Sequence, residues 1–154
     1  MNPLAAGSRA RGLPLFSHLG APIADPAIRR ILSWDEWTGP EDPLAYAIGE
    51  RQQSMHDAII APDEEEAWKR CLDDVVRHVA RLIPYDERQD TWHAPTSAAW
   101  HAGWTFALEA AYVEKAMELP AELRAQIHWF ELGHWPCSLR SATSMADIDG
   151  YVVF

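Results

Sequence analysis

Five prolines divide this chain into segments that have the periodicity of α-helices. Proline is favoured at the first position of a helix, because the N–H that it lacks would have no partner there. The sequence therefore predicts five helices, at about 26–37, 43–60, 62–83, 95–118 and 120–132. The prolines that open them are Pro26, Pro43, Pro62, Pro95 and Pro120.

Two of these segments indicate how the helices pack. The segment 62–83 repeats apolar residues at spacings of three and four, and its charged residues fall on the other side. The segment 95–118 is apolar nearly all round, so we expect it to run through the middle of a helical bundle. Gly103 lies inside it and would permit close packing of a neighbouring helix.

The stretch 128–137 combines a helix stop with several aromatic residues. Gly133 suits the left-handed position that ends a helix, and Pro136 cannot continue one. A polar loop follows over 138–149, and a short strand is expected at Tyr151–Phe154. We interpret the whole stretch as a clasp between the last helix and the terminal strand.

The size and composition fit one domain. With 154 residues, of which 48% are apolar, the chain can bury one sizeable core. We expect residues 1–12 to form a flexible N-terminal tail and 13–154 a single helical domain. The predicted fold class is mainly α, a single-domain bundle of about five helices with a short C-terminal β segment.

The charge of the chain is strongly negative and uneven. The formal net charge is −10, and nine basic against twenty acidic residues lie within 41–154. Such a field repels nucleic acid and anionic membranes and speeds encounter with basic proteins. Two cysteines are too few for a disulfide framework, and no apolar run has the length of a membrane span. We therefore expect a cytoplasmic protein with a basic protein partner, and the sequence leaves its oligomeric state open.

Metal-binding and catalytic patterns are weak in this sequence. Glu131 and His134 have a Glu-x-x-His spacing, but the pair spans the predicted helix stop. A thiolate at Cys137 beside His134 is conceivable, although its neighbours favour packing. We predict no catalytic residue, no metal ligand and no cofactor. The alternative is a metal-dependent helical-bundle enzyme, whose ligands would be Glu131 and His134 with His93, His101 or Glu109.

Tryptophan is unusually frequent, with eight residues in the chain. Three of them fall on helical stripes and are expected in the core: Trp68, Trp100 and Trp104. Four others lie near helix ends or in loops, where either burial or partner contact is open to them: Trp34, Trp37, Trp92 and Trp135. Tryptophan is enriched at the centres of protein interfaces, so these positions favour a binding protein.

The C-terminal block resembles a known family. Trp129-Phe130, Gly-His-Trp-Pro-Cys at 133–137 and the closing Tyr-Val-Val-Phe are similar to the ends of small bacterial immunity proteins of polymorphic-toxin and contact-dependent inhibition systems. The resemblance implies a protein that binds a cognate toxin domain and blocks it. The motif resembles a structural element, so it implies no toxin-contacting residue.

The predicted function is stoichiometric occlusion of a basic toxin domain. Acidic residues would pair with Lys and Arg of the toxin, and one or two Trp would serve as anchors. Two clusters are the candidate contact regions, the start of the segment 62–83 and the connector after it: Asp63, Glu64, Glu65, Glu66, Asp86, Glu87, Asp90 and Trp92. Besides the metal enzyme, a helical scaffold subunit of a larger complex remains an alternative.

Overall fold

A computed structural model of the protein describes residues 29–30, 43–81, 93–139 and 151–153, and in these ranges the fold is mainly helical. Four α-helices make up most of it: α2 (Pro43–Ile59), α3 (Glu65–Ala80), α4 (His93–Glu114) and α5 (Ala121–Glu131). The shorter elements are a 3₁₀ turn and three strands: η2 (Pro62–Glu64), β1 (Arg29–Arg30), β2 (Pro136–Leu139) and β3 (Tyr151–Val153).

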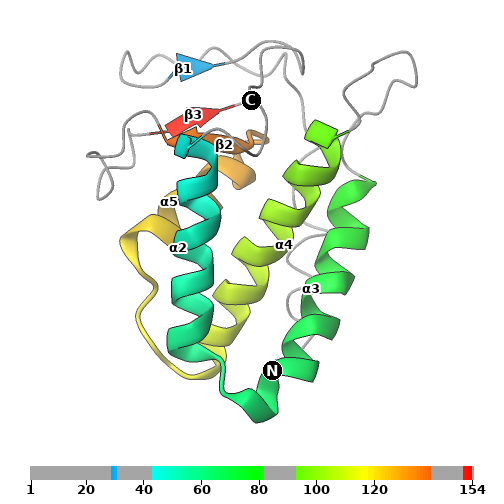
Figure 1. The fold of residues 1–154 in the computed structure, drawn as a ribbon, viewed down its shortest axis with the longest axis vertical. Helices are drawn as coiled ribbons and strands as arrows, with labels where there is room; N and C mark the ends of the chain where they lie inside the picture. The colour runs from blue at the N-terminus through cyan, green and yellow to red at the C-terminus, as the bar shows by residue number, and fades with distance from the viewer. Residues whose placement is uncertain (1–28, 31–42, 82–92, 140–150, 154) are drawn as a thin grey trace.

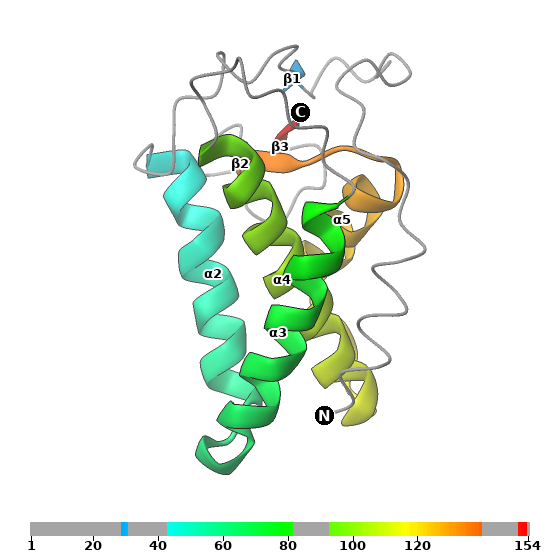
Figure 2. The same cartoon turned by 90° about the vertical axis from the view of Figure 1, so that its right-hand side faces the viewer.

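The four helices lie alongside one another with alternating direction. α2 and α4 begin at the end of the bundle where the strands lie, and α3 and α5 run the opposite way (Figures 1 and 2). α4 packs against each of the other three helices, as its apolar character on all sides predicts. The arrangement is an up-and-down helical bundle capped at one end by a small sheet.

Four of the five predicted helices are present, and the first is wrong where the structure tests it. Arg29 and Arg30 form strand β1, which runs parallel to β3 with Arg29 opposite Val152. A short apolar segment has no periodicity that separates helix from strand, so its pairing partner decides. The rest of the segment 26–37 lies outside the described residues.

The observed helix boundaries differ from the predicted ones at several places. α4 begins at His93, ahead of Pro95, so this proline does not open the helix. The segment that opens at Pro62 starts as the 3₁₀ turn η2 before α3 begins. α4 ends at Glu114, because Ala116 adopts the left-handed conformation with φ 53°. The N–H of Ala116 donates to the Val113 carbonyl and that of Met117 to the Tyr112 carbonyl, which is the Schellman pattern. No glycine marks this stop, so the residue pattern did not predict it.

The main core lies where α3, α4 and α5 meet. Its largest fully buried side chains include Trp68, Phe106 and Phe130. Gly103 lies where α4 meets α3, since a Cβ atom there would be 2.5 Å from Val76 Cγ2. The glycine therefore permits the close helix packing that the sequence predicts.

The C-terminal block has the predicted helix stop and terminal strand. The loop predicted over 138–149 is wrong at its start, because Ser138 and Leu139 pair with β3 as part of β2. Gly133 has φ 83°, and the N–H groups of Gly133 and His134 donate to the carbonyls of Phe130 and Trp129. β2 then pairs antiparallel with β3, with an irregularity in register between Pro136 and Ser138.

β3 is the central strand of the three, in the order β1-β3-β2. Val153 packs in a small cluster with Ile48, Ala125 and Trp129, which holds the strand against α2 and α5. In the described ranges, no helix combines the length and the apolar character that crossing a membrane requires.

Candidate functional site

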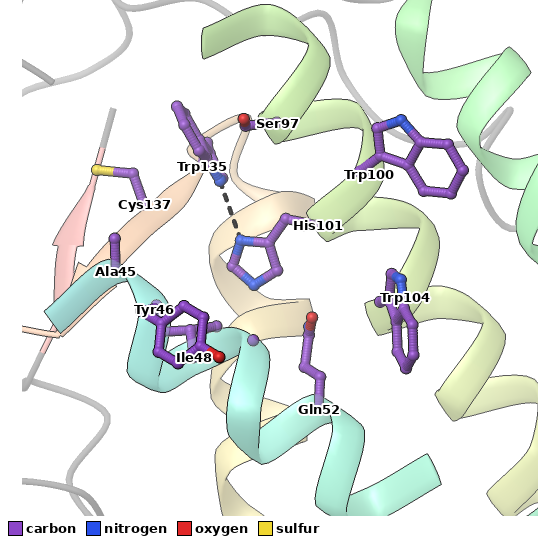
Figure 3. A pocket seen from close by; sticks show the side chains of 11 residues that line it. Ala45, Tyr46, Ile48, Gln52, Ser97, Trp100, His101, Trp104, Trp135 and Cys137 are labelled. Carbon is purple, nitrogen blue, oxygen red and sulfur yellow. Dashed lines mark hydrogen bonds between the residues drawn. The ribbon is translucent and has the colours of Figure 1, made fainter. Parts of the chain in front are cut away.

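A pocket opens between the first half of α2, the first half of α4 and strand β2 (Figure 3). Its volume is about 370 Å³, within the range of sites that hold small ligands or single side chains. The lining is aromatic and apolar with a few polar groups: Ala45, Tyr46, Ile48, Gly49, Gln52, Ser97, Trp100, His101, Trp104, Trp135 and Cys137.

Two exposed aromatic residues border this pocket. Tyr46 on α2 is 60% exposed and Trp100 on α4 is 43% exposed. The prediction that Trp100 lies in the core is therefore wrong, because an all-apolar helix does not reveal which of its sides meets solvent. Trp68 is buried and Trp104 partly buried, as predicted, and Trp135 is buried.

The polar floor of the pocket is a buried network between three helices. The Gln52 side-chain amide donates to Thr105 Oγ1 and to Gln126 Oε1, each at 3.0 Å. Thr105 Oγ1 in turn donates to the His101 carbonyl at 2.9 Å. Both amide protons of Gln52 are thus engaged, which fixes the direction of its carbonyl oxygen. That oxygen points toward the pocket (Figure 3) and accepts no hydrogen bond from the described residues.

His101 is held in one tautomer by Trp135, which directly precedes β2. Trp135 Nε1–H donates to His101 Nδ1 at 3.0 Å, so the ring proton must lie on Nε2. Burial lowers the pKa of His101 from 6.5 to about 4, and the Gln126 side chain offsets this only in part. The ring is therefore neutral near pH 7.

The four acidic residues predicted at 63–66 lie together at the corner between α2 and α3. Glu64 accepts from the Ala61 N–H at 2.8 Å and pairs with Lys115 at 2.6 Å. Lys115, which also donates to the Ile59 carbonyl, holds the pKa of Glu64 below its usual value. Glu65 contacts His56 Nε2 at 3.0 Å. Asp63 and Glu66 are exposed, so the fold itself engages two of the four.

The second predicted cluster, Asp86, Glu87, Asp90 and Trp92, lies outside the described residues. The structure therefore does not bring it together with the acidic corner, and its role stays a prediction from the sequence.

His56 connects the acidic corner to the core. Its ring contacts those of Trp68 and Trp104, with ring centroids 5.0 and 5.6 Å away, and the two indoles also contact each other. Asp57 and Glu65 each contact one ring nitrogen at 3.0 Å, and the contact from His56 lowers the pKa of Asp57. The arrangement ties α2 to the start of α3.

The described residues of the metal alternative form no metal-binding group, and the side chain of His93 lies outside the description. His134 is buried, whereas Glu131 is exposed on the other side of the helix stop. Among the described residues, no three His, Cys, Asp or Glu side chains group in a way that could hold a metal ion. Burial raises the pKa of the Cys71 thiol to about 11, which keeps it protonated and unreactive.

Sequence reasoning did not find the pocket, although one signal for it was present. Gln52 and Thr105 are polar residues on otherwise apolar helix faces, and a buried polar residue needs a partner. Their pairing across α2 and α4 marks the position of the pocket floor.

No family model, no curated protein and no solved structure matches this chain.

Proposed function

We propose that the protein is an immunity protein that binds a basic toxin domain stoichiometrically and blocks it by occlusion. The observation that carries the binding role is the pair of exposed aromatic side chains, Tyr46 and Trp100, at a pocket on the surface of α2 and α4. The toxin as partner comes from the resemblance of the C-terminal block.

Exposed aromatic residues beside a hollow are typical of the energetic centres of protein interfaces. Tryptophan and tyrosine are enriched there because they bury a large apolar area and keep a polar group for hydrogen bonding. Tyr46 also borders a second hollow on α2, which Gly49, Glu50, Gln53 and Ser54 complete. The two hollows together extend over the exposed side of α2.

The charge on this side of α2 suits a basic partner. Tyr46, Glu50, Gln53 and Asp57 follow one another at spacings of three and four, and all are exposed. We call this set the α2 face. With a net charge of −10, the chain also attracts cationic proteins over distance. Glu50 would pair with Lys or Arg of the toxin while the aromatic residues supply the apolar contact.

The acidic corner has a smaller role in this proposal. Glu64 and Glu65 make contacts within the fold, so their carboxylates are less available to pair with a partner. Asp63, Glu66 and the sequence-predicted cluster Asp86, Glu87, Asp90 and Trp92 would extend the contact at its edge. The localisation that fits this role is the cytoplasm, where a toxin must be neutralised.

The test starts from the gene next to the one that encodes this chain. We expect its product to end in a toxin domain that stops bacterial growth, and co-expression of this chain to restore growth. Purified together, the two should form a complex of equal stoichiometry, measured by light scattering and calorimetry. A neighbouring toxin that this chain neither binds nor neutralises would refute the proposal. If the chain is instead a scaffold subunit, it should co-purify with a larger complex.

A charge reversal locates the contact. Glu50→Lys should weaken the complex by about tenfold, and more at low salt, because it places like charges opposite one another. Asp73→Lys is the matched control, since Asp73 is an exposed acid on α3 that does not line the pocket. Equal affinities for the two variants would remove the α2 face from the interface.

A further inference from the structure

We infer that the pocket between α2, α4 and β2 receives one aromatic side chain of the protein partner, a tryptophan or tyrosine whose N–H or O–H donates to Gln52 Oε1. That the ring comes from a protein rests on the proposed function. The chemistry of the ring rests on the pocket alone.

The walls of the pocket select a flat, uncharged group. Four aromatic residues line the pocket: Trp100 and Trp104 on α4, Trp135 just before β2, and Tyr46 on α2 (Figure 3). Aromatic rings favour offset or edge-to-face contact with another ring. No Asp, Glu, Lys or Arg is among the described residues that line the pocket, so neither an anion nor a cation finds a counter-charge.

The polar groups of the pocket favour a ligand that donates a hydrogen bond. Gln52 is 3% exposed, and its oxygen is the one side of the amide that the network with Thr105 and Gln126 leaves open. A ligand that carries an N–H or O–H can donate a hydrogen bond to this oxygen. Any other ligand would displace water from the oxygen without replacing the hydrogen bond, which costs free energy. Phenylalanine would therefore bind less well than tryptophan or tyrosine.

The size of the pocket fits one ring rather than an extended ligand. A volume of about 370 Å³ is near the lower end for ligand sites. The acidic α2 face begins at Tyr46, directly at the border of the pocket, so basic residues near the inserted ring would contact Glu50. One buried aromatic anchor inside a ring of polar contacts is the usual form of an interface hot spot.

The experiment uses the isolated full chain and two probes of the same shape. Indole carries an N–H, and benzofuran has an oxygen at that position. Calorimetry should give one indole site per chain with a dissociation constant below about 1 mM. Benzofuran should bind at least about tenfold more weakly, because its oxygen would face Gln52 Oε1. Equal affinities, or no binding of indole, would overturn the inference.

Two matched variants place the probe in this pocket. Trp100→Ala should weaken indole binding by about fivefold or more, whereas Val113→Ala should leave it unchanged. Both residues are exposed on α4, and Val113 does not line the pocket, so neither change disturbs the core. Indole binding that Trp100→Ala leaves intact would place the ring elsewhere and overturn the inference.

The toxin complex separates this inference from the proposed function. If the complex forms, Trp100→Ala should weaken it by about tenfold or more. A complex that tolerates Trp100→Ala would leave the immunity function intact and overturn the docking of a partner ring. Donor-selective indole binding without any toxin complex would refute the immunity function and the partner, and would support the ring chemistry alone.

Discussion

The pocket and the acidic corner use their polar groups in opposite ways. At the corner, Glu64 and Glu65 carry the charge that the sequence displays, yet Lys115, His56 and the Ala61 N–H engage them within the fold. In the pocket, Gln52 carries no charge but keeps an acceptor directed outward. The proposed binding site therefore rests on unused hydrogen-bonding capacity beside exposed aromatic rings rather than on charge density.

The largest expected effect is on the pH dependence of folding stability, because the His101 ring at the pocket is neutral near pH 7. Its pKa of about 4 lies below the ordinary 6.5, so the unfolded chain takes up a proton between these values and the folded chain does not. The stability that the neutral His101 ring contributes is fully present above pH 6.5 and is lost as the pH falls toward 4. The expected loss that His101 contributes is roughly 3 kcal/mol.

Urea unfolding at several pH values measures this loss as a difference between variants. His101→Asn cannot titrate, so its stability should fall less than that of the natural chain between pH 6.5 and 4. His128→Gln is the control, because His128 is an exposed histidine on α5 that does not line the pocket. Parallel profiles for the natural chain and His101→Asn would show that the pocket wall is not held neutral.

The helices of this fold were predictable because their signals are local. Proline at a helix start and glycine at Gly133 act within one turn of the residues that they affect. β1 was not predictable, since Arg29 and Arg30 take strand geometry from β3 near the other end of the sequence. The stop at Ala116 was missed for a different reason: alanine carries no preference for the left-handed conformation that it adopts there.

The site was harder to predict than the fold. The sequence placed Asp63–Glu66 in one cluster, but it could not show that Lys115 and His56 lie against two of its members. Trp100 and Tyr46 lie on different helices, and only the packing of α2 against α4 brings them to one pocket. Polar residues on apolar stripes, such as Gln52 and Thr105, were the available signal.

A second prediction concerns the structural role of the acidic corner. Lys115→Met keeps the length of the side chain and removes the contacts with Glu64 and the Ile59 carbonyl. The melting temperature should fall by roughly 3–5 °C, while affinity for the toxin stays unchanged. Because Lys115 lowers the pKa of Glu64, this contribution is present above the ordinary pKa of 4.5 and disappears as the pH falls below it.

Lys69→Met is the matched control for this variant, since Lys69 is exposed on α3 and lies 3.8 Å from Glu66. Such surface pairs contribute little, so its melting temperature should stay close to that of the natural chain. Scanning calorimetry at pH 7 and pH 4 gives both readings. Equal melting temperatures for the two variants would contradict a structural role for Lys115.

The smallest expected effect comes from the two corner residues that the fold leaves exposed. The double change Asp63→Lys with Glu66→Lys alters the net charge by four units, which weakens the long-range attraction of a basic toxin. Apart from this long-range part, it should weaken the toxin complex by less than about threefold. Calorimetry at low and high salt separates the two contributions, because salt screens the long-range part and leaves direct contacts. If the loss persists at high salt and exceeds that of Glu50→Lys, the corner is the contact surface, and charge density would have been the better guide after all.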